Sequence, residues 1–597
     1  MNSLGEFLAH LRIFQTYIGP RMYLVFALSF VAALAEGFGL IMGLPLLKTL
    51  GADMEGESGV ADFLGDLLQA LGFGESPVAI LAIIGVVFGF KGVVSFAAGA
   101  YAGHLQAVLV GALRGRMFDA YSRMGYDYYT QRNTGHFINV INEQINGFYR
   151  CFNAFIDFST GLIAVFSYFV LAFVVAWRFG AMALLVGMLM LGLFRYLNSH
   201  VRLLSRQSAR ESGQLSKLLI QCLQAFKYLA ATGQVEPLRG GVMASIQRLT
   251  GYQRGHLIAA AFTRTIAEPV AALFIIAIVI FQIAVMAQPL APIIVSIVLF
   301  HRGLILVLQI QGRWQTAMEL VGSVELVHEE FATQQRRREV GGTRPLRPLT
   351  HGIELKDVHF AYGPHLDPVI KGVSLVIPAR TTVALVGESG AGKSTLVDLL
   401  VLLLRPQRGQ LLIDGTAAEE VDLGSWRRQI GYVAQETVVF DDTLANNICL
   451  WAGDIDRDPD LLRRVEEAAQ RAHIAPFIQT LPEGYHTVVG DRGVRLSGGQ
   501  RQRLFIAREL FKEPNLLILD EATSALDSES EDYIQQSIDA LKGQMTVVII
   551  AHRLATIRNV DRIYVLDRGR LVEQGSYHEL RDAEASRFKA MVAMQRL

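Results

Sequence analysis

A glycine-rich run that ends in a lysine and a serine stands at positions 387–394, with the sequence Gly-Glu-Ser-Gly-Ala-Gly-Lys-Ser. Glycines let backbone amides curl around phosphate oxygens, and the helix that should follow offers its positive N-terminus to the same anion. The lysine would neutralise charge on the β- and γ-phosphates, and the serine can ligate magnesium. A glycine-rich turn without a ligand is the alternative, but the apolar run 382–386 supplies the β-strand that such a loop needs. The residues that we expect around the phosphates are Gly387, Glu388, Ser389, Gly390, Ala391, Gly392, Lys393, Ser394 and Thr395.

Two carboxylates, Asp520 and Glu521, close a second apolar run from Leu516 to Leu519. We expect this run to be a buried strand. Asp520 would then hold Mg2+ through water, and Glu521 would polarise the attacking water as general base. Two acids at a strand end can also simply cap a helix. Because the pair follows the phosphate loop in the expected order, hydrolysis of a nucleoside triphosphate is the better interpretation.

The elements that must position these residues form an α/β domain. Short β-rich runs alternate with helical patterns from about residue 353 onward, which predicts a mainly parallel sheet. The stretch 333–352 holds Arg336 to Arg338, glycines, Pro345 and Pro348, and it is typical of a linker. We therefore divide the chain into a membrane domain at 1–332, a linker at 333–352 and a nucleotide-binding domain at 353–597.

The first half is apolar in long runs. Hydrophobic residues make up 51% of the 597 positions and charged residues 18%, which indicates a composite of membrane-embedded and aqueous parts. A bilayer core of about 30 Å needs about 20 helical residues. Six runs meet this requirement, at 22–47, 77–100, 150–176, 179–197, 265–287 and 290–311. Only Trp177 and Arg178 separate the third run from the fourth, so five spans is the alternative.

Charge gives the orientation of these spans and excludes some partners. The long connections 113–145 and 202–254 are rich in arginine and should be cytoplasmic, whereas 51–76 carries only acidic charges and should lie outside. Both termini then face the cytoplasm, and we expect a multi-pass protein of the inner (plasma) membrane whose segment 1–21 is an amphipathic surface helix. Basic and acidic residues number 55 each, which argues against a nucleic-acid partner. Cys151, Cys222 and Cys449 are too widely spaced for a zinc site or a disulfide framework.

The pentapeptide Leu-Ser-Gly-Gly-Gln at 496–500, taken with the two motifs above, resembles the ATP-binding cassette (ABC) transporters. This resemblance implies ATP and Mg2+ as ligands and a head-to-tail dimer of nucleotide domains. In that dimer the signature segment of one subunit contacts the γ-phosphate held by the other. It also implies that Tyr362 stacks on adenine, that Gln435 senses magnesium, that His552 orients the γ-phosphate and that Asp527 lies in the loop linking the two sites. The signature residues expected to contact nucleotide are Ser497, Gly498, Gly499 and Gln500.

In the first half the resemblance is to exporter-type half-transporters, with six helices fused ahead of the cassette. Tyr128, Tyr129, Thr134 and Gly135 resemble the first coupling segment, and the second should lie near 208–223. Ordinary amphipathic loop helices are the alternative. Because each nucleotide motif occurs once, the expected assembly is a homodimer with two equivalent ATP sites, and a heterodimer with a similar partner is the competitor.

The external loop gives a hint of the substrate. Its apolar residues fall on one helical stripe that could touch a lipid tail, or that could simply pack on the bundle. This stripe is made of Val60, Phe63, Leu64, Leu67, Leu68 and Leu71. The external helix, the opening 34–47 and the stretch 225–229 are similar to the subgroup that flips lipid-linked oligosaccharides. We therefore expect an ATP-driven exporter or flippase that moves an amphipathic substrate outward, such as a lipid or lipid-linked oligosaccharide, with a multidrug or peptide exporter as the alternative.

Ionisable side chains inside or near the spans fit this reading, because charge in a membrane is costly and usually faces a wet cavity or a partner. The alternative is that several of them lie in cytoplasmic helix extensions. The set consists of Glu36, Lys91, Asp157, Arg195, Arg264, Glu268, His301 and Arg302. A regulatory, non-transporting ATPase is disfavoured by the six expected spans and the complete set of nucleotide motifs.

Overall fold

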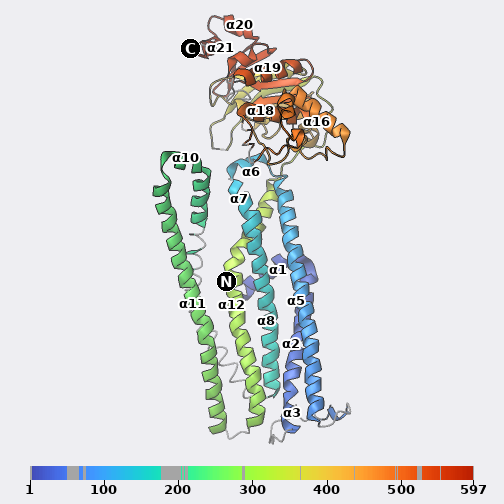
Figure 1. Ribbon diagram of the computed structural model, residues 1–597, viewed down its shortest axis with the longest axis vertical. Coiled ribbons are helices and arrows are strands. Elements are labelled where there is room, and N and C mark those ends of the chain that lie inside the picture. Colours follow the sequence, from blue (N-terminus) through green and yellow to red (C-terminus); the bar gives the residue numbers. More distant parts are fainter. Residues whose placement is uncertain are drawn as a thin grey trace. The chain divides into compact units, whose positions relative to one another are not determined.

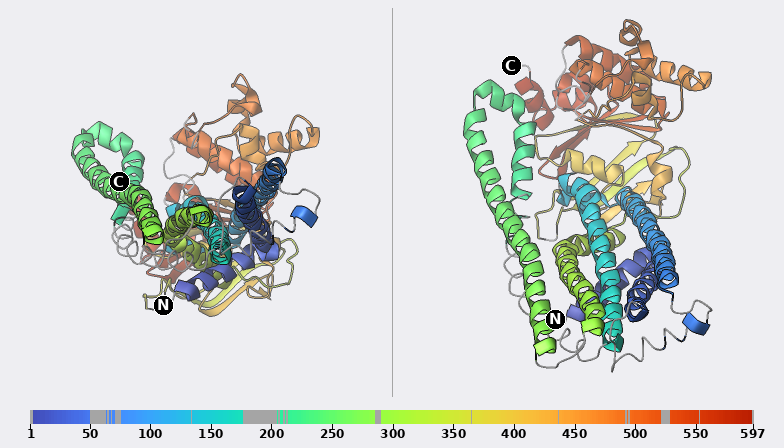
Figure 2. Two further views of the ribbon diagram at one scale, coloured as in Figure 1. Left: turned by 90° about the horizontal axis from the view of Figure 1, so that it is seen from below. Right: turned by 60° about the horizontal axis from the view of Figure 1, so that its bottom comes forward.

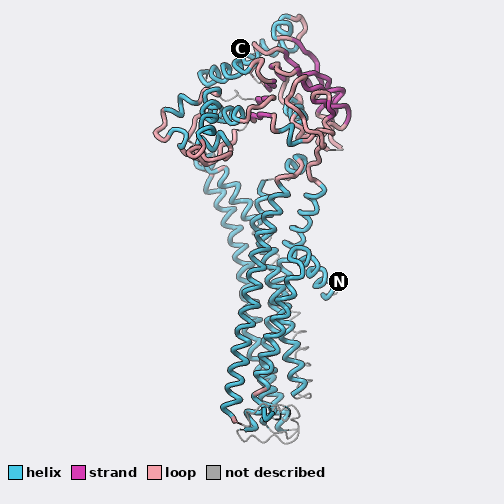
Figure 3. The backbone as a smooth tube through the Cα atoms, turned by 90° about the vertical axis from the view of Figure 1, so that its right-hand side faces the viewer, coloured by secondary structure: helices cyan, strands magenta, loops and turns pink. Residues whose placement is uncertain are grey.

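The computed structural model divides into two compact units, which comprise residues 1–123 with 133–336, and residues 124–132 with 337–597. The structure describes residues 3–49, 76–132, 134–175, 213–284, 290–363, 365–435, 437–490, 495–520, 528–551 and 553–595, together with positions 63, 66, 68–70, 204, 207, 208, 211 and 493. Helices build the first unit, and the named strands all belong to the second (Figure 3).

The first unit consists of long helices that run side by side (Figure 1). Helix α5 alone has 45 residues, which at about 1.5 Å per residue is far more than a bilayer core requires. The helices are α1 (Ser3–Ile18), α2 (Met22–Ile41), α3 (Gly43–Thr49), α5 (Pro77–Tyr121), α7 (Thr134–Asn139), α8 (Ile145–Val175), α10 (Phe226–Thr232), α11 (Val235–Ala284) and α12 (Leu290–Arg336), with a π-helical turn at Val140–Gln144.

Three helical stretches among the described residues are long and apolar enough to cross a membrane, namely Leu11–Ile41, Pro77–Tyr121 and Thr134–Val170. They overlap the first, second and third predicted spans, and only the second, at 77–100, lies wholly inside one of them. Helix α12 includes the sixth predicted span, and α11 includes the fifth as far as Ala284. The fourth predicted span, at 179–197, lies outside the described residues. The count of six therefore stays a prediction.

Helices α8 and α12 pack at close range because glycine removes a side chain from the contact. A Cβ atom added at Gly147 would lie 2.6 Å from the Cβ of Ser323, and one at Gly161 would lie 2.8 Å from Cγ1 of Ile310. Such distances are well inside van der Waals contact, so a larger residue would force the helices apart.

The N-terminal helix α1 is present as predicted, but Phe14 near its C-terminal end is buried rather than left at the surface. Phe14 is fully buried among the rings of Phe148, Phe152 and Phe155 of α8, with centroids 5.2 to 5.5 Å apart. Edge-to-face aromatic packing stabilises such a contact beyond the effect of the apolar area that it buries. The C-terminal part of α1, around Phe14, therefore belongs to the core of the first unit.

Helix α10 lies at the turn of a helical hairpin, whose arms are the helical residues 213–224 and α11 (Figure 2). Glu211 is buried and accepts hydrogen bonds from Ser245 Oγ at 2.7 Å and from Arg248 Nη2 at 2.8 Å, which ties the arm before α10 to α11. Gly233, with φ of +69°, ends α10 in the left-handed conformation that glycine tolerates best. The turn of the hairpin thus falls just after the range 208–223 predicted for the second coupling segment, a role that remains a prediction.

The second unit contains two sheets. A six-stranded sheet has the order β10-β9-β3-β8-β7-β6, and every pair in it is parallel except β10 with β9. This confirms the predicted mainly parallel sheet. Its strands are β3 (Thr382–Val386), β6 (Ile430–Val433), β7 (Leu516–Asp520), β8 (Thr546–Ile550), β9 (Arg562–Asp567) and β10 (Arg570–Gly575). Residues of β3, β7 and β8 are all buried, as expected for strands covered on both faces.

A second, antiparallel sheet of four strands was not expected from the sequence. Its order is β2-β1-β4-β5, formed by β1 (Gly352–Phe360), β2 (Ile370–Pro378), β4 (Arg408–Ile413) and β5 (Thr416–Ala417). Its apolar face shares one core with helix α13 and with the parallel strands. The helices of this unit are α6 (Tyr126–Gln131), α13 (Lys393–Leu400), α14 (Leu423–Arg427), α15 (Leu444–Cys449), α16 (Pro459–Arg471), α17 (Ala475–Gln479), α18 (Gly498–Phe511), α19 (Ser528–Leu541), α20 (Tyr577–Asp582) and α21 (Arg587–Gln595).

Candidate nucleotide site

The glycine-rich loop lies between the end of β3 and the start of α13, as its sequence predicts. Gly392 is the residue before α13 and has φ of +100°, and a Cβ there would lie 2.9 Å from Cδ1 of Ile370. A Cβ at Gly387 would meet the carbonyl oxygen of Leu566. Only glycine fits both positions, so the loop can follow a tight path to the positive end of the helix.

Lys393 is folded back onto this loop. Its Nζ donates to the carbonyl oxygens of Gly387 at 2.8 Å and of Glu388 at 3.0 Å, and the residue is only 6% exposed. The loop itself is closed by a hydrogen bond from the amide of Ala391 to the carbonyl of Glu388 at 3.1 Å. Ser389, Gly390 and Ser394 are exposed, whereas Thr395 is buried. The ammonium is therefore held where an anion bound in the loop would meet it.

Asp520 ends β7, and the loop after β3 lies at the same edge of the sheet because β3 and β7 both pair in parallel with β8. The residue is 8% exposed, and the hydroxyl of Tyr432 donates a long hydrogen bond of 3.5 Å to its Oδ2. Carboxyl ends of parallel strands are where α/β proteins place their ligands. The two motifs predicted to act together are thus brought to one edge.

Two side chains near Asp520 were not singled out from the sequence. Asp398 lies on α13, one helical turn after Ser394, and burial followed by the charge of Asp520 raises the pKa of its carboxyl to about 6. Burial and the Asp520 charge also raise the pKa of the Tyr432 hydroxyl. The spacing of four between Ser394 and Asp398 is a signal that could have pointed to Asp398, because i and i+4 share a helix face. Tyr432 lies three positions before Gln435, but no sequence pattern around it points to a place near Asp520.

Tyr362, predicted to stack on adenine, is 46% exposed and lies edge-on to Phe360 with ring centroids 5.1 Å apart. Its hydroxyl is within 3.0 Å of Oγ1 of Thr395. The ring therefore lies beside the first turn of α13, close to the phosphate loop.

The signature segment forms the start of α18. Ser497 is the N-cap residue, its Oγ accepts from the amide of Gln500 at 3.2 Å, and Oε1 of Gln500 accepts from the amide of Ser497 at 2.8 Å. This reciprocal capping box fixes the first turn of the helix. Ser497 and Gly498 remain exposed and Gly499 is buried, so the positive N-terminus of α18 is open to a ligand from outside the chain.

Of the four remaining predicted site residues, the structure describes one. Gln435 follows β6 and its side chain is exposed. Glu521, Asp527 and His552 lie outside the described residues, so their roles stay predictions.

The donor set of the site fits a magnesium ion. Mg2+ prefers hard oxygen ligands, keeps several waters and is usually bound through one or two carboxylates and substrate phosphates. Ser394 and Asp520 supply a hydroxyl and a carboxylate of this kind, with Asp398 nearby. Within the part of the chain that the structure describes, three or more His, Cys, Asp or Glu side chains nowhere gather as a metal cluster. A metal at this edge would therefore depend on phosphate and water for most of its ligands.

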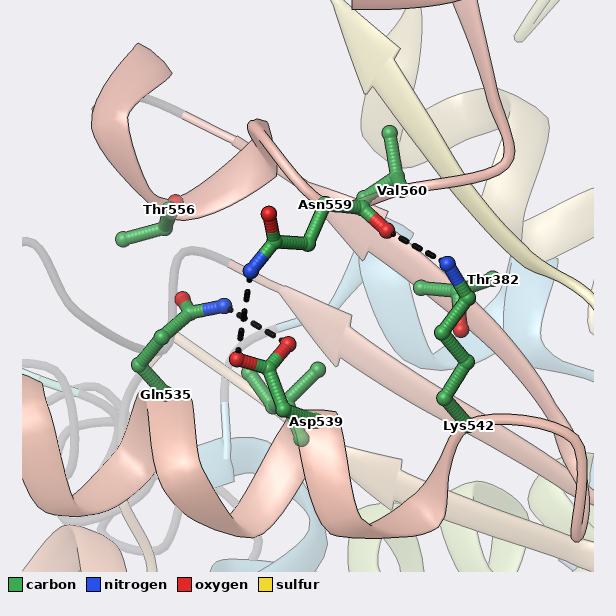
Figure 4. A pocket seen from close by; sticks show the side chains of 8 residues that line it. Thr382, Gln535, Asp539, Lys542, Thr556, Asn559 and Val560 are labelled. Atoms are coloured by element: carbon green, nitrogen blue, oxygen red, sulfur yellow. Dashed lines mark hydrogen bonds between the residues drawn. The ribbon is translucent and has the colours of Figure 1, made fainter.

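A hollow on the second unit lies at the opposite edge of the parallel sheet, next to Thr382 at the start of β3 (Figure 4). Its polar side chains bind one another. Asp539 accepts from Gln535 at 3.1 Å and from Asn559 at 3.4 Å, and Lys542 donates to the carbonyl of Asn559 at 2.8 Å. The hollow is thus a structural junction between α19 and the segment before β9, far from the carboxyl ends of the strands.

Both halves of the chain match families of known proteins. Residues 22–305 match the model of the ABC transporter transmembrane region, and residues 370–524 match the ABC transporter model. The heterocyst differentiation ATP-binding protein HepA of Nostoc sp. is 30% identical over 94% of this chain and 92% of its own. The ATP-dependent lipid A-core flippase of Saccharophagus degradans is 32% identical over 87% of this chain and 86% of its own, and that of Coxiella burnetii 32% over 83% and 84%.

The fold of a bacterial Atm1-family ABC exporter with ATP bound is similar to this one, with a TM-score of 0.78 and 24% identity over 96% of this chain and 98% of that one. The chain therefore belongs to the ABC transporters, with an exporter-type transmembrane region joined to a nucleotide-binding domain. It is an integral membrane protein that binds ATP and couples its hydrolysis to export.

Proposed function

We propose that this transporter flips a lipid or a lipid-linked oligosaccharide from the cytoplasmic to the outer side of the inner membrane. The observation that carries the proposal is that relatives named ATP-dependent lipid A-core flippase, from several bacteria, align over both the membrane and the nucleotide halves of this chain. An amphipathic cargo with a large polar head group follows from that likeness. The termini are proposed to face the cytoplasm, where ATP is available.

Polar groups in the membrane helices support a cargo with a head group. Lys91 Nζ of α5 lies 2.6 Å from Oε2 of Glu36 in α2, and Glu36 is 9% exposed. Arg313 Nη1 of α12 lies 2.6 Å from Oδ2 of Asp157 in α8. Ionisable residues at membrane depth are costly and tend to mark a substrate path or a wet cavity. Such groups suit the polar part of a lipid better than a purely apolar drug.

The catalytic roles are proposed from the arrangement of the site. Lys393 and the loop amides would hold the ATP phosphates, and Ser394 and Asp520 would hold Mg2+, which neutralises charge on the transferred phosphoryl group. Gln435 would sense the metal, Glu521 would act as general base and His552 would orient the γ-phosphate. Tyr362, which is 46% exposed, would stack on adenine.

The proposed assembly is a homodimer. Each nucleotide motif occurs once per chain, and the N-terminus of α18 at Ser497 presents exposed donors that its own capping box does not use up. In a head-to-tail dimer Ser497 and Gly499 would complete the site of the partner, with Asp527 in the connection between sites. Binding of two ATP molecules would close the nucleotide domains, and hydrolysis would reopen them, so that the membrane cavity faces each side in turn.

The test is ATPase activity and lipid flipping by the purified protein in proteoliposomes. The panel contains polyprenyl-linked glycans, lipid A-type glycolipids, phospholipids, peptides and cationic drugs. A flippase should show stimulation by one lipid-linked class and ATP-dependent loss of that lipid from the leaflet in which it was placed. Stimulation and transport only with drugs or peptides would replace the proposal by a multidrug or peptide exporter. Activity of the protein purified alone would establish the homodimer over a heterodimer.

A further inference from the structure

The loop that carries Gln435 joins β6 to α15, and both flanks of Gln435 are held by side chains of one helix, α18. Before Gln435, the amide of Tyr432 in β6 donates to Oε2 of Glu509 at 3.0 Å. After it, Nη1 of Arg508 donates to the carbonyl oxygen of Val438 at 2.7 Å. Gln435 therefore lies midway between two anchors, three residues from each, and the two anchoring residues are neighbours in the sequence.

Arg508 binds two segments at once. The residue is 3% exposed, and besides the bond to Val438 its Nε donates to the carbonyl oxygen of Asn447 at 2.6 Å and its Nη2 to Oδ1 of Asn447 at 2.9 Å. The guanidinium also lies over the ring of Phe440, 5.2 Å from its centroid. A planar guanidinium presents donors in a fixed fork, whereas a lysine ammonium is a compact point charge. Arg508 thus ties the segment after Gln435 to α15.

Asn447 completes this network from α15. The residue is fully buried, its Oδ1 accepts from the amide of Phe440 at 2.9 Å, and its Nδ2 donates to the carbonyls of Phe440 and Thr443, both at 3.0 Å. The side-chain oxygen therefore receives one donor from the loop and one from Arg508, which its two lone pairs allow. Loss of one member would leave a buried polar group unsatisfied, so the network specifies one conformation of the loop.

Glu509 holds the other flank, at the end of β6. The residue is 3% exposed, and the Oε2 atom that binds the Tyr432 amide also accepts from Nζ of Lys512 at 2.7 Å. Strand β6 is at the edge of the six-stranded sheet and pairs only with β7. An edge strand leaves part of its backbone without a strand partner. The carboxylate supplies that partner and fixes the strand from which the loop of Gln435 starts.

We propose that Arg508 and Glu509 are positioning residues for Gln435, which hold the two flanks of its loop so that its side chain meets the metal of the bound Mg-ATP. The inference rests on the magnesium role proposed for Gln435. Both residues are buried and act through the loop rather than on the nucleotide. Because Mg2+ requires near-ideal octahedral geometry, a side chain on a loop is effective only when its backbone is fixed within about 0.5 Å.

The first test measures the loop itself, in the full chain in lipid nanodiscs without nucleotide. Arg508→Lys keeps the charge but loses the fork, and amide hydrogen exchange of residues 437–442 should become about fivefold faster, as expected for loss of one hydrogen bond. Glu509→Ala should speed exchange of the β6 end in the same way, whereas Glu509→Gln keeps an acceptor and should restore it. The matched control is Arg503→Lys on the same helix, since Nη1 of Arg503 binds the carbonyl of His473, in another segment.

The second test measures the effect on the metal. The Mg2+ concentration that gives half-maximal ATPase activity at fixed ATP should rise about threefold or more in Arg508→Lys and in Glu509→Ala. Binding of a fluorescent ATP analogue without Mg2+ should be unchanged, because neither residue touches the phosphates. The double variant Gln435→Ala with Arg508→Lys should be no worse than Gln435→Ala, since Arg508 acts through Gln435.

Unchanged exchange in Arg508→Lys, an equal response of Arg503→Lys, or additive losses in the double variant would overturn the proposal. Loss of metal-free nucleotide binding would show a general structural role and overturn it too. If Arg508→Lys yields no folded protein, the pair Glu509→Ala and Glu509→Gln decides in its place. Unaltered Mg2+ dependence of Gln435→Ala would instead refute the role proposed for Gln435, and with it this inference. Absence of ATPase activity from the unaltered protein would refute the proposed function.

Discussion

The ε-ammonium of Lys393 lies 2.8 Å from the carbonyl oxygen of Gly387 and donates a hydrogen bond to it. A second bond, to Glu388, completes the contact of the side chain with its own loop. Phosphate oxygens of ATP must compete with these carbonyls, and they prevail because a charge-assisted bond between two ions is stronger than one to a neutral carbonyl.

Lys393→Met should therefore weaken ATP binding by about tenfold or more, because it removes the cation that meets the phosphates. The measurement is titration of the purified protein with a fluorescent ATP analogue. Lys371→Met, a change of the same size at another site of the same domain, is the control and should leave affinity unchanged. Equal affinity in the Lys393 variant would contradict the assignment of the phosphate loop.

Glu521→Gln should leave ATP binding intact and abolish turnover, since the amide cannot accept the proton of the attacking water. The drop in kcat is expected to be about a hundredfold or more, the range usual for loss of a general base. Steady-state ATPase assays and nucleotide binding on the same sample provide the check. Normal hydrolysis by this variant would refute the general-base role.

Asp398 should make the stability of the nucleotide domain depend on pH. Its folded pKa of about 6 is above the ordinary value of 3.8, so the stability it contributes is fully present below pH 3.8 and is lost as pH rises through 6. Asp398→Asn should melt above the unaltered protein at pH 7.5 and approach it at pH 5.

Thermal melts of the full chain without nucleotide, from pH 5 to pH 8, measure this difference. The exposed Asp532, replaced by Asn, is the control and should shift nothing. A difference between Asp398→Asn and the unaltered protein that stays constant over this range would show that Asp398 has no raised pKa.

Gly147→Ala should destabilise the membrane unit, because the added Cβ would lie 2.6 Å from the Cβ of Ser323 on α12. Overpacking of this kind costs about 1–3 kcal/mol. Gly99→Ala on α5 meets nothing within 4 Å and serves as the matched control. The melting temperature in detergent should fall for Gly147→Ala alone. Adding Ser323→Gly to this variant should restore it. An equal melting temperature for Gly147→Ala and Gly99→Ala would argue against close packing at Gly147.

Phe63→Asp tests the external stripe. Phe63 is 66% exposed, whereas Leu68 is 4% exposed, so a charge at position 63 should spare the fold while repelling a lipid tail. Leu64, Leu67 and Leu71 lie outside the described residues. Lipid flipping should drop severalfold with basal ATPase activity retained, and Asp66→Asn is the control. Undiminished flipping would leave the stripe without a role in substrate contact.

The sequence alone determined the parts of this protein that rest on local chemistry. The loop 387–394, the strand that ends at Asp520 and the cap at Ser497 are each specified by contiguous residues, because a phosphate loop, a buried strand and a capping box are built over a few positions. Apolar runs likewise located membrane helices, since a bilayer selects for length and hydropathy.

Only the tertiary structure brought Tyr432 and Asp520 together. They are 88 residues apart in the sequence, and their proximity depends on the strand order that sets β6 beside β7. The antiparallel sheet and the burial of Phe14 also arise from such long-range packing. Local patterns encode which elements form, whereas burial of apolar surface between distant elements decides which side chains meet.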